Sequence, residues 1–71
     1  MFKGTIIGRC RLRLILDHRR MTQEDLVVIS GLHKSQINEY INNKRIMSLK
    51  SARIISKSCK CKIEDLYEWL D

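Results

Sequence analysis

The sequence has no proline, no internal repeat, no low-complexity tract and no long apolar run. Its longest unbroken apolar stretch, Leu26 to Ile29, is four residues long, whereas a membrane-spanning helix needs roughly 20. The N-terminus has no apolar segment of the kind that marks a secretion signal. These absences predict a cytoplasmic protein that does not span a membrane.

The sequence has only three cysteines, Cys10, Cys59 and Cys61, and this number is odd. Disulfide frameworks use paired cysteines, and the cytosol keeps thiols reduced. A zinc site needs about four ligands at paired spacings. Cys59 and Cys61 have the wrong spacing, and His18 and His33 are isolated. We therefore expect no disulfide, no metal and no cofactor, with the cysteines buried as small apolar side chains.

Positive charge, by contrast, is abundant. Fourteen Lys and Arg against eight Asp and Glu give a net charge of +6 and a pI near 9.6. This balance favours a polyanionic partner, nucleic acid ahead of a membrane surface, although a basic pI also simply keeps a small protein soluble. A length of 71 residues and a hydrophobic content of 44% predict one folded domain, residues 1–71, with a modest core.

Residues 22–43 carry the most informative pattern in the chain. Thr22 is suited to cap a helix, and Asp25, three residues later, can complete a capping box. Leu26, Val27 and Ile29 give this helix an apolar side, and Gly31 can take the left-handed conformation that ends it. A second helix is predicted over residues 33–42, with apolar residues three and four apart at Ile37, Tyr40 and Ile41. The spacing predicts two short helices joined by a tight turn.

This pattern resembles the helix-turn-helix of the Xre family, which includes the phage Cro and lambda-type repressors. The matching residues of the motif are Thr22, Gln23, Leu26, Gly31, Leu32, Ile37 and residues 42–45. The family's fourth and fifth helices are matched by Ser48, Leu49 and residues 59–61 and 63–67, so the resemblance covers about residues 9 to 70. It implies an all-α fold, a compact five-helix lambda-repressor-like domain. Asn43 stands where the family usually has glycine, and Val27 where it most often has alanine.

The remaining residues fit the other helices of such a domain. Residues 1–5 are expected to be frayed. A basic first helix over residues 9–19 would pack through Leu12, Ile15 and Leu16. Ser48 can cap a helix that runs to about residue 58, with a core face of Leu49, Ala52, Ile55 and Cys59. The last helix, residues 63–70, would pack through Ile63, Leu66 and either Tyr67 or Leu70.

In a helix-turn-helix the second helix enters the major groove and leads with its N-terminal residues. The candidate base-reading residues are His33, Lys34, Ser35, Gln36, Asn38 and Glu39. Lys34 can donate to guanine, Gln36 can pair with adenine, and Glu39 can accept from cytosine. The candidate phosphate contacts are Gln23, Asn43, Lys44, Arg45, Arg20 and Arg13. Each residue taken alone also fits an ordinary solvated surface, and His33 also fits a helix cap.

The predicted function is that of a small Cro-like transcriptional regulator, a repressor of a phage, a mobile element or a bacterial host. Its partner would be double-stranded DNA, bound with modest and salt-dependent affinity. Members of this family commonly gain affinity by binding two half-sites as a homodimer. The candidate protein-interface residues are Leu14, Ile54 and Trp69, which are apolar and lie off the predicted core faces or at the chain end.

Three other functions compete with DNA binding as interpretations of the sequence. A helix-turn-helix scaffold can serve as a protein-interaction module, such as an antitoxin or a modulator of a larger regulator; Leu14 and Ile54 support this, and the polar recognition face opposes it. Membrane binding by residues 9–19 is disfavoured because their apolar stripe is short and has no aromatic anchor. An enzyme is not expected, since paired carboxylates, a glycine-rich phosphate loop and a Cys–His motif are missing, and the chain is too short to enclose a substrate pocket.

Overall fold

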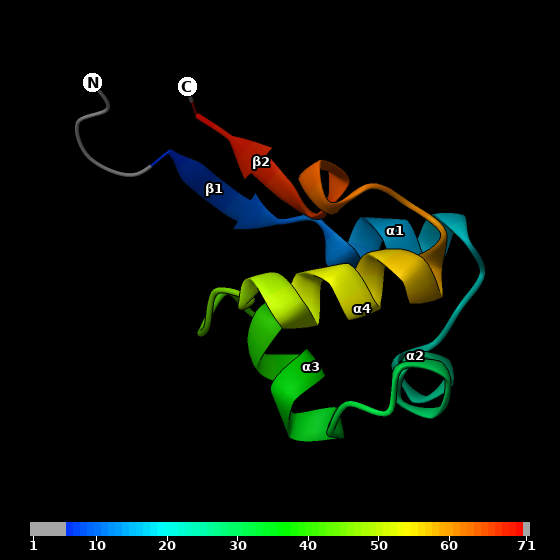
Figure 1. The fold of residues 1–71 in the computed structure, drawn as a ribbon. Coiled ribbons are helices and arrows are strands. Elements are labelled where there is room, and N and C mark those ends of the chain that lie inside the picture. Colours follow the sequence, from blue (N-terminus) through cyan, green and yellow to red (C-terminus); the bar gives the residue numbers. More distant parts are fainter. Residues whose placement is uncertain (1–5, 71) are drawn as a thin grey trace.

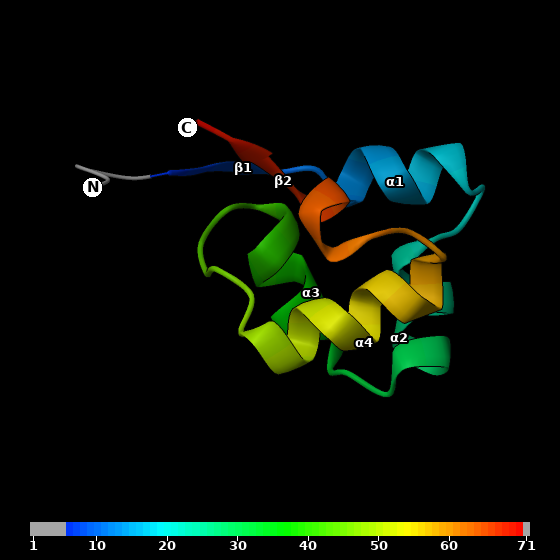
Figure 2. The ribbon, with the colours of Figure 1, turned by 45° about the horizontal axis from the view of Figure 1, so that its top comes forward.

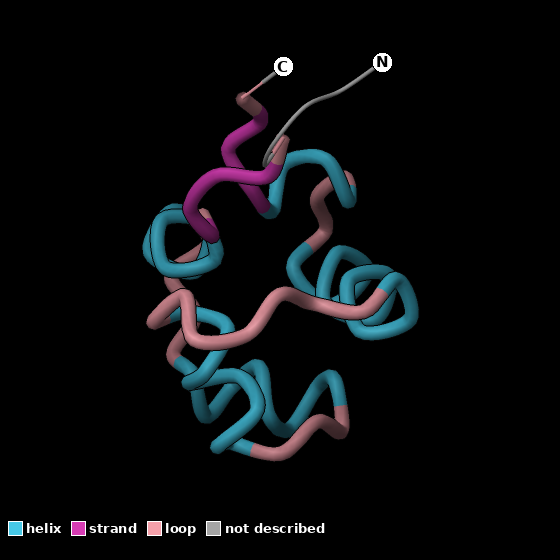
Figure 3. The backbone as a smooth tube through the Cα atoms, turned by 90° about the vertical axis from the view of Figure 1, so that its left-hand side faces the viewer, coloured by secondary structure: helices cyan, strands magenta, loops and turns pink. Residues whose placement is uncertain are grey.

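The structure, a computed structural model, describes residues 6–70. The expected fraying of residues 1–5 lies outside this range. Residues 6–70 form four α-helices, one turn of 3-10 helix and a two-stranded antiparallel sheet (Figure 1). Their order along the chain is β1 (Ile7–Cys10), α1 (Leu12–His18), α2 (Gln23–Ser30), α3 (Lys34–Ile41), α4 (Leu49–Cys59), η1 (Ile63–Leu66) and β2 (Tyr67–Trp69). The two strands lie side by side at the top of the view in Figure 3.

One apolar core is shared by all four helices and by η1. Its buried members are Leu12, Leu16, Leu26, Ile37, Tyr40, Ile41, Met47, Ala52, Ile55, Cys59, Leu66 and Tyr67. These positions include most of those that the helical spacing predicted, because residues three and four apart share one face of a helix. Helix α2 packs against both α3 and α4. The core therefore fixes the position of the second helix of the motif relative to the rest of the chain.

The sheet is the main departure from the predicted all-α domain of five helices. In the antiparallel ladder Ile7 lies opposite Trp69, and Cys10 lies opposite Tyr67. The first helix consequently begins at Leu12 and not at residue 9. The predicted fifth helix is one turn, η1, followed by β2. A Cβ atom at Gly8 would lie 3.0 Å from the Cβ of Glu68, so the close approach of the two strands depends on this glycine.

Two contacts explain why the chain leaves the helical path after Leu66. Tyr67 has extended φ and ψ angles of −137° and 155°, and its buried hydroxyl accepts a hydrogen bond from the N–H of Met47 at 2.9 Å. The indole N–H of Trp69 donates to the carbonyl of Glu64 at 2.8 Å. Both contacts and the pairing with β1 require an extended backbone, which overrides the local preference for helix.

Two smaller expectations about packing were wrong. Leu49 is 77% exposed, because as the first residue of α4 it lies outside the arc formed by Ala52, Ile55 and Cys59. Ile29, expected on the apolar side of α2, is 58% exposed. Of the two alternatives for the last segment, Tyr67 packs inward and Leu70 is exposed.

Candidate nucleic-acid interface

Helix α2 begins with a complete capping box. The Thr22 hydroxyl accepts the N–H of Asp25 at 3.1 Å, and the Asp25 carboxylate accepts the N–H of Thr22 at 2.9 Å. The predicted cap is therefore confirmed. Gln23, the first residue of the helix, is half-buried and lines a hollow of about 240 Å³ together with Arg13 of α1. A side-chain amide at the positive end of a helix, beside a cation, is a suitable place for a phosphate.

The turn between α2 and α3 follows the predicted left-handed path. Gly31 has φ 75°, a conformation that residues with a Cβ rarely adopt. Its N–H donates to the carbonyl of Val27 at 2.9 Å, and Val27 packs half-buried against the core. The Ser30 hydroxyl accepts the N–H of Leu32 at 3.1 Å. These contacts hold α3 in a fixed direction relative to α2.

Helix α3 has an apolar inner face and a polar outer face. The inner residues Ile37, Tyr40 and Ile41 are buried. Among the candidate base-reading residues, Lys34, Ser35 and Asn38 are exposed and Glu39 is half-buried. His33 occupies the cap position and is exposed, but its side chain makes no capping hydrogen bond. These five candidates thus remain accessible to a duplex.

Gln36 differs from the other base-reading candidates. Its Nε2 donates to the Tyr40 hydroxyl at 2.7 Å and to the Ser51 hydroxyl at 3.3 Å. The side chain is half-buried and connects α3 to the first turn of α4. This arrangement favours a role in positioning α3 over the pairing with adenine that the sequence suggested.

Two exposed ion pairs flank the recognition helix. Lys34 Nζ lies 3.1 Å from Glu24 Oε1, and Arg45 Nε lies 3.6 Å from Glu39 Oε1. The hydrogen bond from Lys34, with its charge, lowers the pKa of the Glu24 carboxyl. Both pairs are open to solvent, so they stabilise the fold little and can exchange for contacts with bases or phosphates.

Arg13 lies between the hollow at the start of α2 and a second hollow at the end of α3. The second hollow, about 380 Å³, is also lined by Arg9, Arg11, Asn42 and Asn43. Two of the candidate phosphate contacts, Arg13 and Gln23, are therefore neighbours, and Arg13 also adjoins a third, Asn43. The structure adds Arg9 and Arg11, which the sequence placed on the first helix but not at the site; only the path of β1 brings them to the end of α3.

The remaining phosphate candidates lie in turns. Asn43 has the left-handed φ of 59° that the sequence allowed, and its Oδ1 accepts the N–H of Cys10 at 2.7 Å. That bond ties β1 to the end of α3, so this oxygen serves the fold. Lys44 and Arg45 follow and are exposed. Arg20 is exposed in the turn after α1, with φ 55°.

The three candidate protein-interface residues lie on different elements. Leu14 of α1 is 62% exposed, Ile54 of α4 is half-buried, and Trp69 of β2 is 44% exposed. Trp69 lines an apolar hollow of about 230 Å³ with Ile46 and Leu49, both of which are exposed. Ile46 and Leu49 were not among the predicted interface residues.

Residues 6–70 contain no group of three or more His, Cys, Asp or Glu side chains that could hold a metal ion. The three thiols are free, and burial raises the pKa of the Cys59 thiol to about 11. None of the helices within residues 6–70 has the length and apolar character needed to cross a membrane.

The capped α2, the glycine turn and the polar outer face of α3 define a helix-turn-helix DNA-binding domain. Comparison with known proteins gives the family: residues 11–71 match the model of the Cro/C1-type HTH DNA-binding domain, and the chain belongs to that family.

Two curated relatives and one solved structure place the chain further. It is 31% identical over 64 residues to YopS, an SPbeta prophage-derived uncharacterized HTH-type transcriptional regulator of Bacillus subtilis, covering 89% of this chain and 86% of YopS. It is 35% identical over 60 residues to YotL, a second such regulator from the same prophage, covering 83% of this chain and 75% of YotL. The restriction-modification controller protein C.AhdI of Aeromonas hydrophila has the same fold, with a TM-score of 0.72, 24% identity, and coverage of 78% of this chain and 83% of C.AhdI. The chain is a DNA-binding transcriptional regulator of the helix-turn-helix type.

Proposed function

We propose that this regulator is a small Cro-like repressor that reads a specific operator in the major groove with residues 33–42. The observation that carries the proposal is the division of α3 into two faces. Its buried residues hold the helix on the core, while side chains with both donors and acceptors remain accessible. A mixed set of donors and acceptors is what base edges in the major groove require.

The base-reading roles follow from the position and chemistry of each side chain. Lys34, in the first turn, is placed to donate to guanine once it leaves Glu24. Ser35 and Asn38 offer shorter polar groups on the same exposed side. Glu39, a turn later, is placed to accept from cytosine. His33 adds a ring at the leading end of the helix.

Phosphate contacts would hold α3 in register on the duplex. The two hollows that share Arg13 form one candidate surface, with Gln23 at one side and Arg9, Arg11 and Asn42 at the other. Lys44 and Arg45 extend it beyond the end of α3, and Arg20 lies at the turn before α2. Since such contacts carry no sequence information, they account for affinity and salt dependence and not for the choice of operator.

We further propose that the protein binds its operator as a homodimer through the apolar surface of Ile46, Leu49 and Trp69. A second copy suits this surface because Ile46 directly follows Arg45, a candidate phosphate contact. A two-fold contact there would bring two recognition helices toward the same face of a duplex. Leu49→Glu is expected to abolish dimers in sedimentation equilibrium, with Leu14→Glu as the control on another element. An unchanged dimer in Leu49→Glu would exclude this surface.

The proposal is tested by selecting bound sequences from a random duplex library at about physiological salt. A palindromic motif with half-sites about one helical turn apart is expected. A single half-site would reject the homodimer but keep base reading. Enrichment of no motif, with binding that merely disappears as salt rises, would reject the operator-specific repressor and turn attention to a protein partner.

A further inference from the structure

The segment from the end of α3 to the start of η1 has a one-sided charge that the recognition helix does not explain. Residues 40–63 contain no Asp or Glu, and their seven cationic side chains are Lys44, Arg45, Lys50, Arg53, Lys57, Lys60 and Lys62. Only the first two directly follow the helix-turn-helix. The other five lie on α4 and on the segment that connects it to η1.

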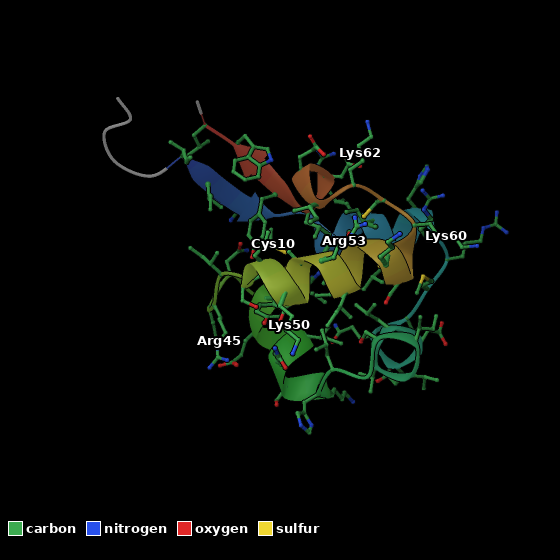
Figure 4. All side chains as sticks on the ribbon, viewed as in Figure 1. Cys10, Arg45, Lys50, Arg53, Lys60 and Lys62 are labelled. Carbon is green, nitrogen blue, oxygen red and sulfur yellow. The ribbon has the colours of Figure 1, made fainter. Side chains whose placement is uncertain are left out.

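Four of these cations form a stripe along α4, here called the α4 stripe: Lys50, Arg53, Lys57 and Lys60. The three within the helix fall inside about 60° of its circumference and span about 10 Å along its axis. Lys60 follows directly at the end of the helix, with φ 56°. All four are exposed, on the side opposite the buried Ala52, Ile55 and Cys59. Figure 4 shows Lys50, Arg53 and Lys60 following one another along α4.

The stripe is unfavourable for folding. Like charges three and four residues apart repel each other on a helix, and Lys50 lies in the first turn, where the helix dipole favours an acidic residue. Helix α2 has Glu24 and Asp25 in its first turn, whereas α4 has no acidic residue there. The two ion pairs found within residues 6–70 involve no stripe residue. An external polyanion would relieve this repulsion.

The stripe lies apart from the candidate phosphate contacts beside Arg13. Neither of the two hollows that Arg13 lines includes a stripe residue. Figure 2 shows α1, which carries Arg13, above α4, with the segment that leads to η1 between them in this view. The Arg19 guanidinium donates to the carbonyl of Lys60 at 2.9 Å, which adds a further cation at the end of the stripe. A duplex held against Arg13 and Gln23 would therefore leave the stripe free.

We propose that the α4 stripe binds the phosphate backbone of a second DNA segment, separate from the operator that α3 reads. The occupant is DNA because a row of cations at helical spacing suits a line of phosphates. A membrane surface is disfavoured, since the exposed apolar side chains nearest the stripe, Ile46, Leu49 and Trp69, gather at the start of α4 and do not continue along it. One bound protein would then hold two DNA segments together. The inference rests on the proposed function only for the identity of the operator.

The test measures capture of a second duplex by protein that is already saturated with operator. Biotinylated palindromic operator, supplied as one duplex per two copies of the protein so that no free operator competes for the stripe, fills the recognition helices. A dye-labelled duplex without the operator is then titrated in at several salt concentrations. The test variant is Arg53→Gln with Lys57→Gln, which has a net charge of +4. The control, Val28→Glu with Ile29→Glu, has the same net charge and changes two exposed residues of α2.

Wild type and control are expected to capture the second duplex. The Arg53→Gln, Lys57→Gln variant should capture it about tenfold less well, with a salt slope lower by about two, while it binds operator within about twofold of wild type. Equal capture by the variant and the control would overturn the proposal, as would no capture by wild type. A parallel loss of operator affinity would mean that the stripe contacts the operator duplex itself, which also overturns it.

Failure of the proposed function gives a different pattern. If library selection enriches no operator, binding of each variant to a random duplex replaces the capture step. The stripe is then supported only if the Arg53→Gln, Lys57→Gln variant binds more weakly than the equally charged control. Equal binding of the random duplex by this variant and the control would reject DNA binding by the α4 stripe.

Discussion

Helices α3 and α4 have similar inner faces and very different outer faces. Each buries an apolar arc in the same core. The outer face of α3 mixes one cation, Lys34, with amides and a hydroxyl, and acidic side chains lie at Glu24 and Glu39. On α4, by contrast, the exposed residues after Leu49 are all cations, namely Lys50, Arg53 and Lys57. Mixed chemistry distinguishes one base pair from another, whereas cations alone attract any phosphate. On the proposed function, the acidic neighbours of α3 would limit non-specific attraction where the operator sequence is read.

The largest expected effect tests whether the inner faces of α3 and α4 contribute equally to stability. Ile37→Ala in α3 and Ile55→Ala in α4 remove fully buried side chains, and each should lower the free energy of unfolding by about 2–5 kcal/mol. Urea denaturation, monitored by circular dichroism, measures the free energy of unfolding. Ile54→Ala, at a half-buried position, is the control and should lose less. A small effect in only one of the two buried variants would show that the helices do not depend equally on the core.

Base reading by α3 is the next largest effect. Lys34→Ala should weaken operator binding by about 1–3 kcal/mol and relax the preference at one base pair. Gln36→Ala should mainly lower stability, because its amide bonds Tyr40 and Ser51. Binding to the operator and to all its single-base variants measures both. If Gln36→Ala changes base preference without loss of stability, the structural role given to Gln36 is incorrect.

The helix ends offer a further contrast between α3 and α4. The Ser48 hydroxyl accepts the N–H of Ser51 at 3.1 Å and caps α4, whereas His33 makes no such bond for α3. Ser48→Ala should therefore lower the free energy of unfolding by about 1 kcal/mol. His33→Ala should leave it nearly unchanged. The urea midpoints of the two variants measure these changes. Equal losses of stability in Ser48→Ala and His33→Ala would contradict the difference between the two helix ends.

Arg45, which follows α3 in the chain, tests whether a cation beside the recognition helix contacts phosphates and not bases. Arg45→Ala should weaken binding to all sequences alike and reduce the salt slope by about one. Affinities for operator and random duplexes over a range of salt concentrations measure this. A loss confined to the operator would indicate a base contact, through Arg45 itself or through the paired Glu39.

The smallest effect concerns the acidic residue beside Lys34. Glu24→Gln frees that lysine and should strengthen binding to any duplex by about two- to threefold. The fold lowers the pKa of the Glu24 carboxyl from its ordinary value of 4.5. The ion pair therefore contributes its full stability at pH values above this ordinary pKa. This contribution is lost as the pH falls through the lowered pKa. Wild type should lose slightly more stability than Glu24→Gln between pH 5 and pH 3; identical losses would mean that the pair contributes nothing.

Local signals predicted the central part of the molecule well. Thr22 and Asp25 form the expected cap, Gly31 and Asn43 take the expected left-handed conformation, and the predicted inner residues of α3 and α4, except Leu49, lie in the core. Each of these features depends on residues within a few positions of one another. The surface of α3 could likewise be named from the sequence, although its contacts with bases remain a prediction.

The sequence by itself determined the helix-turn-helix, since caps, turn residues and helical spacing are local properties. Only the tertiary structure decided the sheet, because Ile7 meets Trp69 across nearly the whole chain and no local pattern encodes that pairing. It also decided that Gln36 faces Ser51 and that Arg9 and Arg11 approach the end of α3. These placements arise where separate elements pack together, so they depend on the whole core and not on any one segment.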